Sequence, residues 1–268
     1  MKKKVLITVL ILAVALSILF AFTLGAGAEA AEPTLSIGGK TLVMENSIYI
    51  RYLVSAENVE NINDVSVFVW NDAAKLYDKE AAVAEVKTTG ANEVKDGVTY
   101  YYFEFTGVAA KMLADDFYAV VYTTVDGVEY KSAPSKYSVV KYAYNMMGKL
   151  DKPASTVENL VPLLETMLDY GASAQTFFGY KTETPANADF YQIKTVGGKL
   201  ADGFADGLYV EGKEVTITAD APADGFKFVG WKQGSTGEIV SADMTATVIV
   251  GTANETYTAV YEEVIAAA

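Results

Sequence analysis

The side chains that most often perform catalysis or bind metals are missing from this sequence. It contains no histidine and no cysteine. Serine–histidine and cysteine–histidine nucleophiles, zinc sites built on these residues and haem ligation are therefore excluded. Carboxylates remain, and two of them could serve as the catalytic pair of a glycosidase. The nearest candidates are Asp115, Asp116 and Glu104.

An enzymatic function is nevertheless not expected. The chain has 34 acidic residues, so some pair of carboxylates will look suitable in any fold. A solvated surface is the simpler interpretation of these acidic residues, because charged side chains are seldom buried without a partner. We predict no catalytic residues, with an extracellular carbohydrate-active enzyme that uses a carboxylate pair as the alternative.

An acidic, glycine-rich segment runs from Asp202 to Gly207 and could suggest calcium binding. Its sequence, DGFADG, lacks the alternating acidic positions of an EF-hand loop. Asp-Gly pairs are typical of tight turns. We predict turns here, and no metal or other cofactor.

Aromatic residues are the best candidates for ligand binding. Trp70, Tyr100 and Tyr102 lie in strand-like segments, and an aromatic ring on a sheet can pack against the apolar face of a sugar. Core packing is the favoured interpretation for all three, with sugar or protein binding as the alternative, and it is also the expected role of Trp231. If Tyr100 and Tyr102 were both more than half exposed, a purely structural role would be rejected.

These aromatic residues belong to a series of strands predicted between residues 33 and 135. The strands cover 48–54, 65–70, 98–105 and 118–125, and a hairpin across Asp126-Gly127 leads to 128–130. A long exposed excursion is expected between Trp70 and Val98, where the alternation fades.

The last two long strands are apolar on both faces. Tyr101, Phe103 and Phe105 should face the main core, and Tyr100 and Tyr102 should point the other way. A sheet with one face in water would alternate apolar with polar residues. Something therefore covers the second face, or part of that face is a binding surface.

Two helices should follow the strands, at 137–150 and 155–178, where apolar residues recur at helical spacing. Ser155 and Glu158 could form a capping box, but Pro162 would delay the regular helix to about Asn159. Gly179 is a plausible end. One apolar stripe comprises Leu160, Val161, Leu164, Met167, Leu168, Gly171, Ala172, Gln175 and Phe178. We expect the helices, or the excursion, to bury Tyr100 and Tyr102.

A second module should follow a linker at 181–188. About five short strands separated by glycines fill the remainder, which is typical of a small all-β module. We therefore predict two folded modules, at 33–180 and 189–263. Each should build its own hydrophobic core, because the chain has no disulfides to stabilise it.

Two stretches resemble known families. The segments from Tyr209 to Ala219, from Gly225 to Trp231 and from Tyr257 to Tyr261 resemble the bacterial surface repeat related to the internalin B-type repeat. That resemblance implies a β-grasp-like fold and a spacer, stalk or adhesive unit. The helix from Met167 to Tyr180, with Tyr137 to Ala143 before it, is similar to an uncharacterised region of secreted proteins from Gram-positive anaerobes. This second likeness covers 35–191 and implies an extracellular accessory module without a known ligand.

The first thirty residues indicate export. Lys2, Lys3 and Lys4 precede an apolar run, and small residues follow it at Ala26, Ala28 and Ala30. This order is typical of a cleaved signal peptide over 1–30, although a run of this length could also serve as an uncleaved membrane anchor. We predict that the mature chain begins between Glu29 and Glu32 and is secreted or displayed at the surface of a Gram-positive type of cell.

The negative net charge of the chain excludes some classes of binding partner. Removing residues 1–30 would change the formal charge from −13 to −15, since three lysines and Glu29 are lost. Such a chain is unsuited to binding nucleic acid, because that binding requires a positively charged protein surface. It is equally unsuited to docking on an anionic membrane. The expected partner is an extracellular glycan or protein, and the expected state is a monomer.

Together these features predict an α+β fold that is mainly β. A β-sandwich-like module is closed by two helices and followed by a small β-grasp-like repeat. The predicted function is that of a non-enzymatic extracellular or cell-surface interaction or accessory module, adhesive or carbohydrate-associated. The carbohydrate-active enzyme and a purely structural spacer are the alternatives.

Overall fold

Two β-sheets with alternating side chains build the first module. In the computed structural model, which describes residues 31–235 and 237–264, the first sheet has the order β1-β2-β6-β5. Its strands are β1 (Thr34–Met44), β2 (Ile48–Glu57), β5 (Thr88–Lys95) and β6 (Val98–Phe105). The predicted signal peptide at 1–30 lies outside the described residues.

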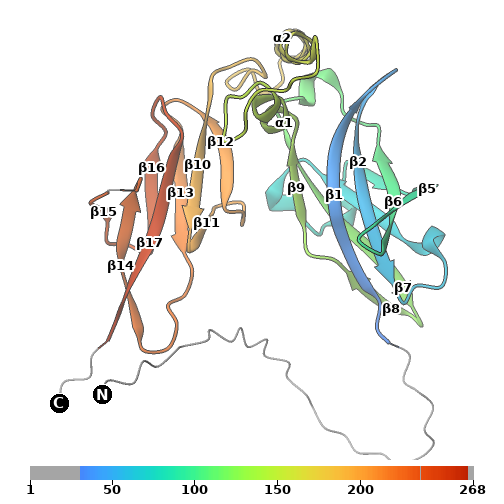
Figure 1. The fold of residues 1–268 in the computed structure, drawn as a ribbon, viewed down its shortest axis with the longest axis horizontal. Helices are drawn as coiled ribbons and strands as arrows, with labels where there is room; N and C mark the ends of the chain where they lie inside the picture. Colours follow the sequence, from blue (N-terminus) through green and yellow to red (C-terminus); the bar gives the residue numbers. More distant parts are fainter. Residues whose placement is uncertain (1–30, 236, 265–268) are drawn as a thin grey trace, which may run out of the picture. The chain divides into compact units, whose positions relative to one another are not determined.

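The second sheet packs face to face against the first (Figure 1). Its order is β4-β3-β7-β8, and β9 also pairs with β7. The strands are β3 (Ser66–Trp70), β4 (Ala84–Val86), β7 (Asp116–Val125), β8 (Val128–Lys131) and β9 (Ser135–Ser138). Residues of both sheets form one core that includes Ile50, Tyr52, Phe103, Val67 and Phe117. The predicted β-sandwich-like module is thereby confirmed.

The hairpin predicted at Asp126-Gly127 joins β7 to β8. Both residues have positive φ, at 51° and 78°, as a two-residue type I′ turn requires. The alternation in β6 is confirmed as well, because Phe103 and Phe105 are buried in the main core and Tyr101 packs against it.

The excursion after Trp70 is more ordered than a plain loop. It contains the 3₁₀ turns η2 (Ala73–Lys75) and η3 (Lys79–Ala81), followed by β4 and β5. Ala73, Leu76 and Ala82 pack on a second cluster formed by Trp70, Tyr118, Val120 and Tyr122. This segment therefore covers the outer face of β3 and β7 and explains why these strands are apolar on both sides. Two further 3₁₀ turns are η1 (Ile62–Asp64) and η4 (Ala110–Met112).

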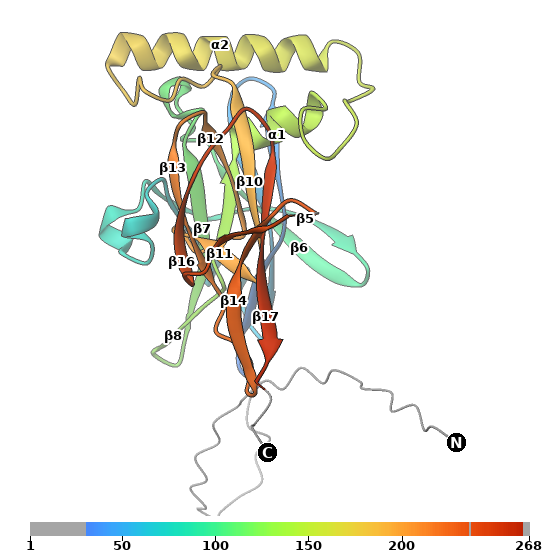
Figure 2. The same ribbon diagram turned by 90° about the vertical axis from the view of Figure 1, so that its left-hand side faces the viewer.

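The two helices close one end of the sandwich. In Figures 1 and 2, α1 (Val139–Met146) and α2 (Leu160–Phe178) lie beyond the ends of the strands, not across the face of a sheet. Val139, Ala143, Leu164 and Leu168 reach into the main core. The helices therefore seal the gap between the sheets.

Helix α1 is shorter than predicted, whereas α2 begins near Asn159, where Pro162 was expected to delay its start. Residues 135–138 are taken up by β9, where Tyr137 pairs with Phe117 of β7, so α1 begins at Val139. The capping box considered at Ser155 and Glu158 does not form at the start of α2, because the helix begins after Asn159 without a side-chain cap. Gly179 ends α2 in a left-handed conformation, as predicted.

The second module contains two small sheets with their own core. One has the order β12-β10-β17-β14-β15 and the other β11-β13-β16. The strands are β10 (Phe190–Val196), β11 (Gly198–Leu200), β12 (Asp206–Val210), β13 (Glu214–Ala219), β14 (Phe226–Gln233), β15 (Ile239–Ser241), β16 (Thr245–Ile249) and β17 (Glu255–Glu263). The first strand, β10, pairs in parallel with the last, β17.

Trp231 occupies the centre of this second core. Its side chain is 0% exposed, and its indole N–H donates to the carbonyl of Met244 at 3.3 Å. Phe228 packs edge-on against it, with ring centroids 6.0 Å apart. The predicted core role of Trp231 is confirmed.

Candidate functional site

A group of polar and aromatic side chains lies on the outer face of the first sheet. We call Arg51, Tyr100, Tyr102 and Glu104 the tyrosine–arginine face. Arg51 of β2 lies opposite Glu104 of β6 in the antiparallel register, and Arg51 Nε donates to Glu104 Oε1 at 2.8 Å. The guanidinium carbon of Arg51 lies 4.6 Å from the centroid of the Tyr102 ring. Adjacent strands thus place a cation, a carboxylate and aromatic rings side by side.

Tyr100 and Tyr102 are half-buried, and neither is more than half exposed. Tyr100 packs on the backbone of β1, where a Cβ atom at Gly38 would lie 2.2 Å from Tyr100 Cε1. The Tyr102 hydroxyl donates to Glu93 Oε2 of β5 at 3.0 Å, and this bond raises the pKa of Tyr102. Of the two covers that were expected for these rings, the helices or the excursion, the excursion supplies a contact to Tyr102 through Glu93, and the helices lie at the end of the sandwich (Figure 1). Neighbours in the same sheet cover them partly, and the excursion contributes Glu93.

Trp70 is separated from the two tyrosines. It belongs to β3 in the second sheet, is 0% exposed, and donates its indole N–H to the carbonyl of Asp78 at 2.7 Å. Phe68 stacks beside it at a centroid distance of 6.2 Å. In this structure no face of the Trp70 ring is available to a ligand.

The carboxylates considered for catalysis are each held by a cation. Asp115 has a fully buried side chain that accepts hydrogen bonds from Lys181 and from the Tyr180 hydroxyl, both at 2.7 Å. Glu104 is bound to Arg51. Asp116 forms an ion pair with a different lysine, Lys136, at an N–O distance of 2.8 Å. The two adjacent aspartates therefore serve separate ion pairs.

The segment from Asp202 to Gly207 forms the predicted turns. Asp202 Oδ1 accepts from the backbone N–H of Phe204 at 3.0 Å, and the N–H of Gly203 donates to the carbonyl of Leu200 at 2.9 Å. Gly203 has a φ of 85°, which favours glycine. No group of three or more acidic side chains among residues 31–235 and 237–264 is placed to hold a metal ion.

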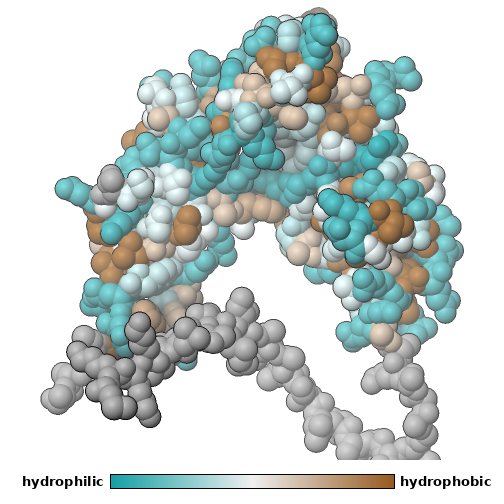
Figure 3. All heavy atoms as spheres, in the orientation of Figure 1, coloured by the Kyte–Doolittle hydropathy of each residue, from teal (hydrophilic) through white to brown (hydrophobic). Residues whose placement is uncertain are grey.

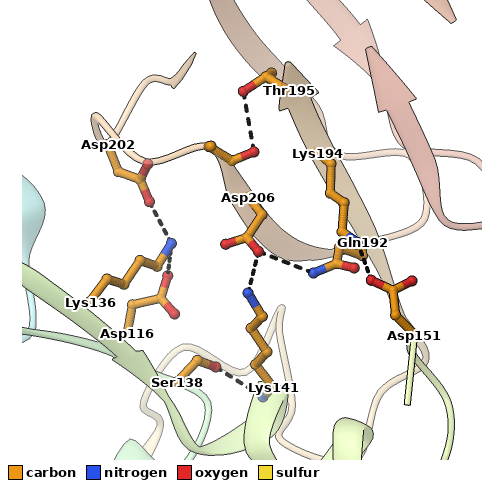
Figure 4. Close-up of polar contacts among 11 residues, drawn as sticks. Asp116, Lys136, Ser138, Lys141, Asp151, Gln192, Lys194, Thr195, Asp202 and Asp206 are labelled. Carbon is orange, nitrogen blue, oxygen red and sulfur yellow. Dashed lines mark hydrogen bonds and ion pairs between the residues drawn. The ribbon is translucent and has the colours of Figure 1, made fainter. Parts of the chain in front are cut away.

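This turn also joins the two modules. Lys136 of β9 binds Asp116 at 2.8 Å and Asp202 of the second module at 2.5 Å (Figure 4). Although burial opposes the charge, the two carboxylates raise the pKa of Lys136. Burial also raises the pKa of Asp116. The Phe204 ring packs on Tyr118 at a centroid distance of 5.7 Å.

Further contacts continue this junction. Lys141 of α1 binds Asp206, and Lys194 of β10 binds Asp151 (Figure 4). Phe190 belongs to the main core of the first module, and Leu208 and Val210 pack against it. Apolar packing and ion pairs thus both connect the two modules.

A cleft of about 500 Å³ opens beside these ion pairs, and we call it the junction cleft. It is formed by Lys40 of β1, Asp116 of β7, the continuous segment of β9 and α1, and the chain from Phe204 to Leu208. Lys40, Lys141, Tyr142 and Asn145 are among the residues that line it. No motif in the sequence indicated this cleft, because its residues come from four segments far apart in the chain. Only the pairing of β9 with β7 and the position of the turn at Asp202 bring them together.

The end of α2 presents exposed aromatic side chains. Tyr170 is 64% exposed, Phe177 83% and Phe178 63%, and Figure 3 shows hydrophobic residues at the surface over the helices. The inclusion of Phe178 in the buried stripe was therefore wrong. The buried face of α2 consists of Leu164, Met167, Leu168, Gly171, Ala172, Ala174 and Gln175.

Comparisons with known proteins bear on the second module. Searches of curated proteins and of solved structures found no significant match, and the likeness proposed for residues 35–191 is without support. No helix among the described residues is long and apolar enough to cross a membrane. Residues 192–265 match the family model of the divergent InlB B-repeat domain. The second module is thus similar to a bacterial surface repeat, and this match supports the resemblance predicted for the C-terminal part of the chain.

Proposed function

We propose that this protein is a secreted or surface-displayed, non-enzymatic module that binds an extracellular glycan through the tyrosine–arginine face. The observation that supports this proposal is the grouping of two half-buried tyrosine rings with Arg51 and Glu104 on one outer sheet face. Aromatic rings offer an apolar surface to a sugar ring. Guanidinium and carboxylate groups provide the donors and acceptors that sugar hydroxyls require.

The arrangement of the carboxylates favours binding over catalysis. A glycosidase needs two carboxyl groups that face each other across the scissile bond. Asp116 and Asp202 both bind Lys136, and the ammonium of this lysine is shared by the two carboxylates. A glycosidic oxygen would have to occupy the place of that ammonium. Both carboxylates are therefore better suited to joining the modules.

A glycan array tests the proposal. Wild-type protein should bind a glycan, and Tyr102→Ala should weaken that binding at least tenfold, as expected when a contact worth more than about 1.4 kcal/mol is lost. Tyr130→Ala is the matched control, since Tyr130 is a half-buried tyrosine in β8 of the other sheet. The control should bind like the wild type.

Two results would contradict glycan binding at this face. Absence of any bound glycan would favour the purely structural spacer. Binding that Tyr100→Ala and Tyr102→Ala leave intact would place the site elsewhere.

Export is part of the same proposal. Release into the medium requires cleavage of the signal peptide at one of the small-residue sites, so the mature protein should begin between Glu29 and Glu32. Mass spectrometry of the protein from the culture medium measures this directly. An intact Met1 in cell-associated protein would support a retained membrane anchor instead.

A further inference from the structure

The junction cleft is positively charged although the protein is strongly acidic. The whole chain has a formal charge of −13. Four lysines and two aspartates line the cleft, which gives its lining a net formal charge of +2. Positive charge remains in excess even when Asp202, which binds Lys136 from the second module, is included. A local excess of this kind favours a negatively charged ligand.

Not all of these lysines are neutralised by the protein. Lys136 and Lys141 bind carboxylates. Lys40 forms no ion pair within the described part of the chain, and its ammonium donates to Ser135 Oγ at 2.7 Å. Partial desolvation of that ammonium and the nearby charge of Lys141 lower the pKa of Lys40. A bound anion would compensate for both effects.

We propose that the junction cleft binds an acidic saccharide, with the sugar carboxylate held by Lys40 and Lys141. The volume of about 500 Å³ falls within the range of roughly 300–1,000 Å³ that is usual for small-molecule sites. Tyr142 and Phe204 add ring surfaces to the lining, and Ser135 and Asn145 add polar groups. This combination suits a sugar ring with hydroxyl groups.

A single carboxylate fits the cleft better than a phosphate. Asp116 and Asp206 also line it, and they would repel a phosphate, whose two charges lie on one group, more strongly than a saccharide that carries one charge on each sugar ring. Among the described residues of the lining, neither Lys40 nor Lys152 forms an ion pair, so the cleft offers ammonium groups that no protein carboxylate neutralises. The cleft is distinct from the tyrosine–arginine face, and the two proposals can fail separately.

Isothermal titration with trigalacturonate tests the acidic saccharide site. The wild-type protein should bind trigalacturonate, and binding should weaken as salt is added. Lys40→Gln should reduce the affinity at least tenfold, because a charge-assisted hydrogen bond of about 1.5–3 kcal/mol is lost. Lys199→Gln is the matched control, since Lys199 is an exposed lysine in β11 without an ion pair among the described residues. The control should bind normally.

Two further ligands identify the chemistry that is recognised. The methyl-esterified trisaccharide keeps the sugar rings but lacks the charge, and should bind at least tenfold more weakly. Inorganic phosphate should not compete with trigalacturonate at equal concentration. Equal binding of the ester, stronger binding of phosphate, or affinity for trigalacturonate that is absent or unchanged in Lys40→Gln would each overturn the proposal. Circular dichroism of Lys40→Gln confirms that the variant is folded.

Discussion

Tyr52 brings a hydroxyl group into the centre of the sandwich core. The side chain is 0% exposed, and its hydroxyl is buried without a hydrogen-bond partner, as is that of Tyr137 in the described residues. An unpaired buried polar group typically costs about 1–3 kcal/mol of stability. The core therefore tolerates a local penalty at this position.

Replacing Tyr52 with phenylalanine should remove this penalty. We expect Tyr52→Phe to raise the free energy of unfolding by about 1 kcal/mol, measured by urea denaturation. Tyr144→Phe is the control, because the Tyr144 hydroxyl donates to the carbonyl of Ala188 at 2.7 Å and accepts from the N–H of Phe190 at 3.2 Å. That control should lower stability. A loss of stability in Tyr52→Phe would indicate a bound water that satisfies the hydroxyl.

Trp231, unlike the Tyr52 hydroxyl, stabilises the core in which it is buried. Because the ring is fully buried, Trp231→Ala should cost about 3–5 kcal/mol through lost burial and the cavity left behind. Phe226→Ala in the same strand β14 removes a side chain that is 46% exposed, and should cost much less. Equal losses for both variants would mean that the second core is not organised around the indole.

At the scale of elements, the sequence predicted which segments form strands better than it predicted where strands and helices begin and end. The strong alternation in β2, β3, β6 and β7 identified these strands. In β1 the pair Gly38-Gly39 sits at a register shift and interrupts the pattern, so this strand was missed. The start of α1 was placed too early because Tyr137 fits a helical stripe, while its pairing with Phe117 in β7 is invisible to local periodicity.

The second module should fold alone, but it should be less stable without its packing contacts to the first module. Its own core includes Ile193, Leu200 and Trp231, so residues 189–263 should show one cooperative thermal transition. In the full chain Leu208 packs against the first module. Leu208→Ala should therefore destabilise the full chain by about 1 kcal/mol more than the isolated module.

Thermal and urea unfolding of the isolated module measure this difference. Absence of any transition in residues 189–263 would show that the repeat depends on the first module. An identical cost of Leu208→Ala in both proteins would show that the junction contributes no stability.

At the scale of the whole molecule, the fold class followed from the sequence but the sites did not. Period-two alternation and two helical stripes were sufficient to predict a mainly β protein closed by helices. The junction cleft depends on long-range packing of β9, α1 and the turn at Asp202, which no local pattern encodes. Tyr100 and Tyr102 could be assigned to one strand face, yet their partners Arg51 and Glu93 follow only from the strand order.

The set of ionisable side chains predicts that stability is nearly constant around neutral pH and falls at alkaline pH. The chain has no histidine or cysteine, so few side chains titrate between about pH 6 and 9. Burial raises the pKa of tyrosines in every core, among them Tyr52, Tyr122 and Tyr257, and raises that of Tyr209 to about 12. In the unfolded chain these groups ionise near pH 10. Stability should therefore be full below about pH 10 and fall above it, as the unfolded state loses protons first.

Urea midpoints between pH 6 and pH 11.5 check this prediction. The midpoint should be nearly constant up to about pH 9 and should decline steeply above pH 10. A midpoint that stays constant to pH 11 would show that the buried tyrosines ionise equally in both states.

The parallel pairing of β10 with β17 has a mechanical consequence. Ile193 lies opposite Glu255, and Val196 opposite Thr258, so tension between residues 190 and 263 would pull the two strands along their axes in opposite directions. The hydrogen bonds between them would then share the load in shear. By contrast, Phe226 of β14 pairs with Glu263 in an antiparallel ladder, and tension between these two residues would open the bonds one after another. Single-molecule stretching should therefore require more force through residues 190 and 263 than through 226 and 263, which would make the repeat a stiff connector along one direction only.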